Sequence, residues 1–152
     1  MGVCRPCTIA LNHSNLTSMG AKHMALSAFD HLVVRVADLD EGIATYRDTL
    51  GLDLDRTDQS EALGIKQAFF NLPGGGFIEV VAPFDSQSAV GQALEKRGEG
   101  IHTVAFAVDD LNAACESLKA GGARLIGEGQ PVVFIHPRST HGILIQLSEK
   151  KA

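Results

Sequence analysis

Hydrophobic and polar residues follow one pattern twice along this chain. Valine-rich runs with alternating polar positions begin at residues 30 and 101, and an Asp-Leu pair comes where each run stops. Each pair is followed by a helix-like segment and then by short extended runs. Because alternation with a period of two is typical of strands, and a spacing of three to four is typical of helices, the pattern predicts two βαβββ modules and an α+β fold.

The boundaries of these elements can be placed from the apolar runs and the turn residues. The first copy predicts a strand over 30–37, a helix that Asp38 or Asp40 caps and that carries Ile43, Tyr46 and Leu50 on its apolar stripe, and strands over 52–57, 65–72 and 77–82. A short helix over 86–97 connects the copies, and the second copy predicts a strand over 101–108, a helix over 110–120, and strands over 124–126, 132–136 and 142–147. The run Pro73-Gly74-Gly75-Gly76 predicts a hairpin turn, because glycine tolerates positive φ.

The duplication repeats polar side chains at matching places. His31 and His102 open the first strands and lie 71 positions apart, while Glu79 and Gln146 lie inside the last strands, 67 positions apart. A period this long indicates a duplicated module and not a solenoid. Two imidazoles and two oxygen-bearing side chains are ligands that suit a divalent Zn, Mn, Co, Ni or Fe ion.

The neighbours of these side chains on the strands bear on whether they face a cavity or solvent. Strict alternation places Glu79 on one face with Phe77 and Val81, and His102 on one face with Val104, Phe106 and Val108. Apolar neighbours favour an interior cavity, in which an unpartnered polar group costs about 1–3 kcal/mol. The alternative is that alternation turns these polar groups to an exposed sheet face.

Composition limits the class of protein. The chain has 152 residues, 45% of them hydrophobic, and a net charge of −5, which argues against nucleic acid and membrane partners. Three cysteines are too few for a disulfide framework, and cytoplasm is the expected location. Residues 1–27 lack periodicity and are expected to be a disordered leader, although Cys4, Cys7 and a histidine could hold zinc. The folded domain is expected over 28–149, with modules over 29–84 and 100–149.

Several motifs carry a resemblance to a known family. They are Asp30-His31-Leu32, Tyr46-Arg47-Asp48-Thr49-Leu50-Gly51-Leu52, Ile78-Glu79-Val80-Val81-Ala82-Pro83, Leu94-Glu95-Lys96-Arg97-Gly98-Glu99-Gly100-Ile101-His102 and Phe134-Ile135-His136-Pro137-Arg138-Ser139-Thr140. Over residues 29–149 the chain resembles the vicinal oxygen chelate superfamily, also called glyoxalase/bleomycin resistance, and within it the methylmalonyl-CoA epimerases. The resemblance implies a glyoxalase-like half-barrel cavity and a homodimer.

The resemblance also implies a site. A divalent metal ion would be held by His31, Glu79, His102 and Gln146, would chelate two oxygens of an acyl-CoA substrate, and would stabilise an enediolate. The chain departs from the family at two of the site positions and in a shorter loop before Val132. The eighth-strand glutamate is Gln146, and the third-strand carboxylate that serves as a base is Gln67, which leaves Glu79 as the acid–base group among the catalytic positions.

Other functions and residues stay open from the sequence. Two histidines and one carboxylate also form the ligand set of iron oxygenases, a glyoxalase-type lyase is a further possibility, and a protein that sequesters a ligand would need no chemistry. Arg35 shares the face of His31, and its place at the end of a strand favours solvent. Lys96, Arg97 and Arg138 are candidates to meet the phosphates of CoA. Cys115 is expected in the core of the second helix, and His141 on a loop surface.

Overall fold

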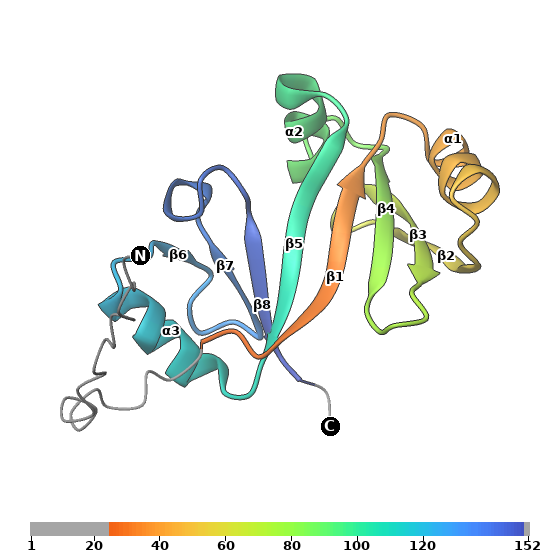
Figure 1. Ribbon diagram of the computed structural model, residues 1–152. Coiled ribbons are helices and arrows are strands. Elements are labelled where there is room, and N and C mark those ends of the chain that lie inside the picture. Colours follow the sequence, from red (N-terminus) through yellow and green to blue (C-terminus); the bar gives the residue numbers. More distant parts are fainter. Residues whose placement is uncertain (1–24, 151–152) are drawn as a thin grey trace, which may run out of the picture.

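The computed structural model describes residues 25–150, in which one mixed sheet of eight strands carries three α-helices (Figure 1). The first module consists of β1 (Ala28–Arg35), α1 (Leu39–Ala44) continued by the π-helical turn Thr45–Thr49, β2 (Leu54–Ser60), β3 (Ile65–Asn71) and β4 (Phe77–Pro83). Helix α2 (Ala89–Arg97) connects the modules. The second consists of β5 (Gly100–Val108), α3 (Leu111–Ala120), β6 (Leu125–Ile126), β7 (Val132–Ile135), a 3₁₀ turn over Pro137–Ser139, and β8 (Ile145–Glu149).

The strand order shows the duplication in space. The order across the sheet is β2-β3-β4-β1-β5-β8-β7-β6, so the opening strands of the two modules lie side by side at the centre (Figure 1). Each opening strand runs parallel to the last strand of its own module, β1 with β4 and β5 with β8, and the two opening strands are antiparallel to each other. The predicted α+β fold with two βαβββ modules is confirmed. The division of the chain into a leader and a domain at residue 28 stays a prediction.

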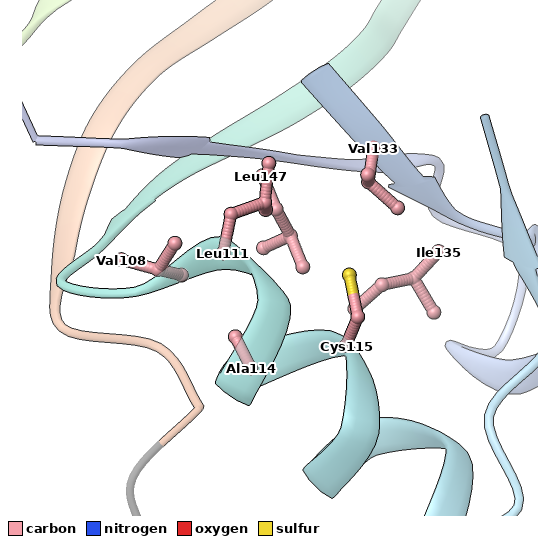
Figure 2. Close-up of a cluster of buried hydrophobic side chains, with 7 residues drawn as sticks. All are labelled: Val108, Leu111, Ala114, Cys115, Val133, Ile135 and Leu147. Carbon is pink, nitrogen blue, oxygen red and sulfur yellow. The ribbon is translucent and has the colours of Figure 1, made fainter. Parts of the chain in front are cut away.

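Helix α3 covers one face of the second module. Val108 of β5, Leu111, Ala114 and Cys115 of the helix region, and side chains of β7 and β8 point toward one another and form a buried cluster (Figure 2). Cys115 is buried there and its thiol is free, as expected for a packing residue. Asp110 caps the helix by accepting a hydrogen bond from the Ala113 amide. This arrangement commits one sheet face to packing and leaves the opposite face for a site.

Helix α1 packs in the same way on the first module. A methyl group at Gly42 would come within 2.9 Å of Val80, so the absence of a side chain lets the helix approach the sheet closely. Ile43 and Tyr46 pack against the buried cluster around Phe70 and Val80, as their spacing predicted. The prediction for Leu50 was wrong, because this side chain is 58% exposed. A π turn adds a residue per turn and so rotates the positions that follow it off the apolar stripe.

None of the helices within residues 25–150 has the length and apolar character needed to cross a membrane. Residues 1–24 of the expected leader lie outside the described residues, and so do its possible zinc ligands Cys4 and Cys7. The last strand begins at Ile145 and not at residue 142, because Thr140 and Gly142 donate backbone hydrogen bonds back to Pro137 in a turn.

Candidate active site

A cavity of about 810 Å³ lies on the sheet face away from α3 and is lined by both modules. It receives His31 and Val33 from β1, Gln67 from β3, Glu79 from β4, His102 from β5 and Gln146 from β8. In β8, Gln146 lines the cavity while its neighbour Leu147 is buried against α3, which is the alternation expected of a strand between two environments. The structure thus brings all five predicted site residues to one place.

Two β-bulges aim the histidines into this cavity. The β1–β5 pairing passes from Phe29 opposite Phe106 to His31 opposite Ala105, and then from Val33 opposite Thr103 to Val34 opposite Ile101. One residue is therefore skipped immediately before His31, and His102 is skipped itself. Bulges occur beside active sites because they redirect a side chain without ending the strand.

Because of the bulge at His102, the residues that share its sheet face differ from those that strict alternation predicted. Strict alternation grouped His102 with Val104 and Phe106, but Phe106 packs against the α3 cluster on the other face. The cavity lining holds His102 and Thr103 together, since the extra residue shifts the alternation by one position. The prediction that His102 faces a cavity agrees with its position, and the grouping that led to it was wrong.

Glu79 occupies the centre of a polar group on the cavity floor. The Gln67 amide donates a hydrogen bond of 2.5 Å to Glu79 Oε1, and Glu79 Oε2 lies 3.7 Å from His31 Nε2. The side chains of His31 and Glu79 are only 10% and 12% exposed. Since a carboxylate offers about four lone-pair positions, Glu79 keeps acceptor capacity after it takes the bond from Gln67.

The other nitrogen of His31 is held from outside the cavity floor. Nδ1 lies 2.5 Å from Asp30 Oδ2, and the ring stacks on Phe77 with centroids 4.4 Å apart and planes at 12°. A carboxylate that accepts Nδ1–H fixes the orientation of the ring and directs Nε2 into the cavity, where Glu79 Oε2 lies 3.7 Å away. The sequence analysis assigned no role to Asp30, although its position next to a candidate ligand histidine was a usable signal.

His102 is held in its neutral form. Burial, and then the positive charges of Arg35 and Arg97, lower its pKa to about 4. Its Nδ1 is buried and has no hydrogen-bond partner among the described residues. A neutral imidazole with an unused nitrogen is the state in which histidine binds a metal ion or accepts a hydrogen bond from a ligand.

The structure corrects the expectation that Arg35 lies in solvent. Arg35 is 4% exposed, and it donates hydrogen bonds from Nε to the carbonyl of Gly98 at 2.7 Å and from Nη1 to the carbonyl of Ile101 at 2.5 Å. The strand alternation did place its side chain on the buried face of β1 with His31. The sequence misled because the chain segment that covers the end of β1 comes from the distant residues 98–101.

The remaining candidates lie elsewhere. Lys96, Arg97 and Arg138 are exposed, and the cavity lining drawn from residues 25–150 does not include them. His141 is exposed on a turn, as expected, and His136 accepts a hydrogen bond from the Arg138 amide through Nδ1.

The nitrogen and oxygen donors at the predicted metal positions are of the types that a divalent cation binds, and the spacing of His31 and Glu79 also suits one. Two ligands that each lie about 2.1 Å from one ion are separated by roughly 3–3.5 Å, and the His31–Glu79 separation of 3.7 Å is near that value. Within residues 25–150, no three side chains of the His, Cys, Asp and Glu types gather closely enough to form a metal cluster as they stand. His102 and Gln146 line the same cavity, and their side chains would have to join the pair.

Comparisons with known proteins agree with this architecture. Residues 30–139 match the family model of the glyoxalase/bleomycin resistance protein/dioxygenase superfamily. The ethylmalonyl-CoA/methylmalonyl-CoA epimerase of Cereibacter sphaeroides is 32% identical over 82% of this chain and 98% of its own length, and the lactoylglutathione lyase of Haemophilus influenzae is 32% identical over 80% and 92%. The crystal structure of methylmalonyl-CoA epimerase from Mycobacterium tuberculosis superposes with a TM-score of 0.73 at 36% identity and covers 88% of this chain and 97% of that one. The chain belongs to the glyoxalase/bleomycin resistance protein/dioxygenase superfamily and is similar to enzymes of its epimerase branch.

Proposed function

We propose that this protein is a metal-dependent epimerase of an acyl-CoA that carries a second carbonyl group at its α-carbon, of the methylmalonyl-CoA type. The observation that carries the proposal is the position of Glu79, a nearly buried carboxylate between the Gln67 amide and the His31 imidazole on the cavity floor. A relative that covers most of the chain bears the name of such an epimerase.

The metal would be held by His31, Glu79, His102 and Gln146, two residues from each module. A divalent cation in that place supplies Lewis-acid stabilisation of the negative charge that develops when an α-proton leaves. The residues of the chain would prepare the site by orienting the His31 imidazole, through Asp30 and Phe77, and by keeping the His102 imidazole neutral, through burial.

Glu79 would move the proton. Its Oε1 accepts the Gln67 hydrogen bond, which fixes the plane of the carboxylate, and a carboxylate lone pair that neither Gln67 nor the metal uses would take the proton. Removal of the α-proton by Glu79 would leave a planar carbanion, and a proton taken from solvent on the opposite face would invert the centre. Glu61 and Asp85 also line the cavity but are exposed, so neither is held as Glu79 is.

Exchange of the α-proton with solvent tests this function. Methylmalonyl-CoA in D₂O, with enzyme loaded with Co²⁺, Mn²⁺, Ni²⁺ or Zn²⁺, should gain one deuterium at the α-carbon as measured by NMR. The variant Glu79→Gln should lose this exchange by at least about 10²-fold, as expected for the loss of a general base, whereas the matched variant Glu61→Gln should keep it. Absence of exchange with every metal, in protein shown to bind one, would rule out the proposal.

A lyase is the second candidate, because a lactoylglutathione lyase is also 32% identical, over 127 residues. The same preparations can be offered the hemithioacetal of methylglyoxal and glutathione, with product followed by ultraviolet absorbance. Turnover of the hemithioacetal without α-proton exchange in methylmalonyl-CoA would favour the lyase. The expected homodimer stays a prediction that sedimentation velocity can test.

A further inference from the structure

Arg35 is a buried cation whose place in the fold carries a cost. It is 4% exposed, and among residues 25–150 no carboxylate forms an ion pair with it. Burial lowers its pKa, and the nearby charge of Arg97 lowers it further. Because a desolvated charge without a counter-ion destabilises the folded state, a residue with these properties calls for a role that an apolar side chain of similar size would not fulfil.

The guanidinium joins the end of β1 to the segment that delivers His102. Its two hydrogen bonds go to the carbonyls of Gly98 and Ile101, at 2.7 Å and 2.5 Å. Gly98 and Gly100 both have positive φ, at 71° and 142°, so the backbone between these carbonyls is conformationally permissive. The planar fork of arginine can fix two carbonyls at a set separation, which lysine cannot do.

The second carbonyl belongs to the peptide unit that precedes His102. The β1–β5 pairing skips His102, so the ladder does not fix the residue at this point. The bond from Arg35 to Ile101 therefore supports the backbone where the strand pairing is interrupted. A further hydrogen bond, from the Ala37 amide to the Glu99 side chain, holds the same segment between the two carbonyls that Arg35 binds.

We propose that Arg35 is a positioning residue, which sets the direction of the His102 imidazole into the cavity by clamping the carbonyls of Gly98 and Ile101. The role rests on the proposed function only in so far as His102 is a metal ligand. The geometry at His102 is a property of the protein without metal as well, and the two can be measured separately.

The first test measures the imidazole itself. In metal-free protein, ring ¹H–¹³C spectra of Arg35→Met and Arg35→Lys should show the His102 signal displaced or broadened, while the His31 signal keeps its position. Arg97→Met is the matched control, since it removes a nearby positive charge without removing a bond to the segment 98–101. The proposal is overturned if the Arg35 variants fold, as near-ultraviolet circular dichroism reports, and His102 stays where it is in the wild type.

The second test measures the metal. Titration with Co²⁺, followed by its visible absorption, should show about 10–100-fold weaker binding by Arg35→Met, a range typical of residues that orient a ligand, and little change for Arg97→Met. In a His102→Gln background, Arg35→Met should cause no additional loss, because the clamp acts through His102. An equal loss in both backgrounds would overturn the positioning role. Failure of the wild type to bind Co²⁺ would instead remove the proposed metal function, and the ring spectra would still decide the role of Arg35.

Discussion

Gln67 and Glu79 lie on neighbouring strands, and the amide of the first donates a 2.5 Å hydrogen bond to the carboxylate of the second. The β3–β4 register places Phe69 opposite Glu79, so Gln67 reaches its partner diagonally on the same sheet face. The resemblance to the epimerases implied a carboxylate at position 67. In this chain an amide stands there and holds Glu79 by a hydrogen bond, so that in the proposed function Glu79 would act as the base and Gln67 as its support.

Restoring the carboxylate at position 67 should raise activity. We expect Gln67→Glu to increase α-proton exchange in methylmalonyl-CoA by about 10²-fold, because a second general base would join the cavity. Repulsion between two neighbouring carboxylates raises the pKa of one of them. A base of higher pKa removes a proton from a weakly acidic carbon more readily. The measurement is deuterium uptake by NMR at several pH values.

The matched variant for this prediction is Gln67→Leu, which keeps the approximate volume and removes the hydrogen bond. We expect it to fall below the wild type, since Glu79 would lose the partner that fixes its plane. If Gln67→Glu proved slower than Gln67→Leu, the added carboxylate would not act as a base, and the division of roles described above would be wrong.

Stability should depend on pH through His102. Burial and the charges of Arg35 and Arg97 lower its pKa from 6.5 to about 4. Between these values the unfolded chain binds a proton that the folded chain does not, so this contribution to stability is complete above about pH 6.5 and declines as the pH falls toward 4. Urea unfolding of metal-free protein at steps across this window should show the decline, and His102→Gln should flatten it.

A second histidine serves as the control for this experiment. His141 is exposed on a turn with a φ of 54°, a conformation that asparagine tolerates. The variant His141→Asn should therefore follow the wild-type curve. A decline of the same size in His102→Gln and in the wild type would assign the pH dependence to other groups.

The duplication explains how much of the site could be predicted from the sequence. His31 and His102 mark equal places in two modules, and Glu79 and Gln146 mark another pair, so symmetry singled out four side chains that line one cavity. The neighbours of His102 did not follow, because a β-bulge leaves no trace in the alternation of side chains. The burial of Arg35 could not be predicted either, since the carbonyls that it binds lie 63 and 66 positions away.

The carboxylate behind His31 should tune metal affinity. We expect Asp30→Asn to weaken Zn²⁺ binding by about 10–100-fold, because an amide accepts the Nδ1–H bond but polarises the ring less than a carboxylate does. Competition with a chromophoric chelator measures the change. Asp58→Asn, in an exposed carboxylate that accepts a bond from the Gln59 amide, is the control and should bind as the wild type does. Equal affinity of Asp30→Asn and the wild type would show that Asp30 only packs beside the ring.

Two adjacent glycines in the β3–β4 turn allow backbone strain to be separated from displacement of the site. Gly75 and Gly76 have φ values of 96° and 75°, so alanine at either position is strained. A methyl group at Gly75 would meet nothing within 4 Å, whereas at Gly76 it would lie 2.8 Å from the Asp30 carbonyl. Both variants should therefore lose stability, by about 1–3 kcal/mol in urea unfolding. Only Gly76→Ala should also weaken Zn²⁺ binding, because it pushes on the residue that holds His31. If both variants bound Zn²⁺ as the wild type does, the position of Asp30 would not control the affinity of His31 for the metal.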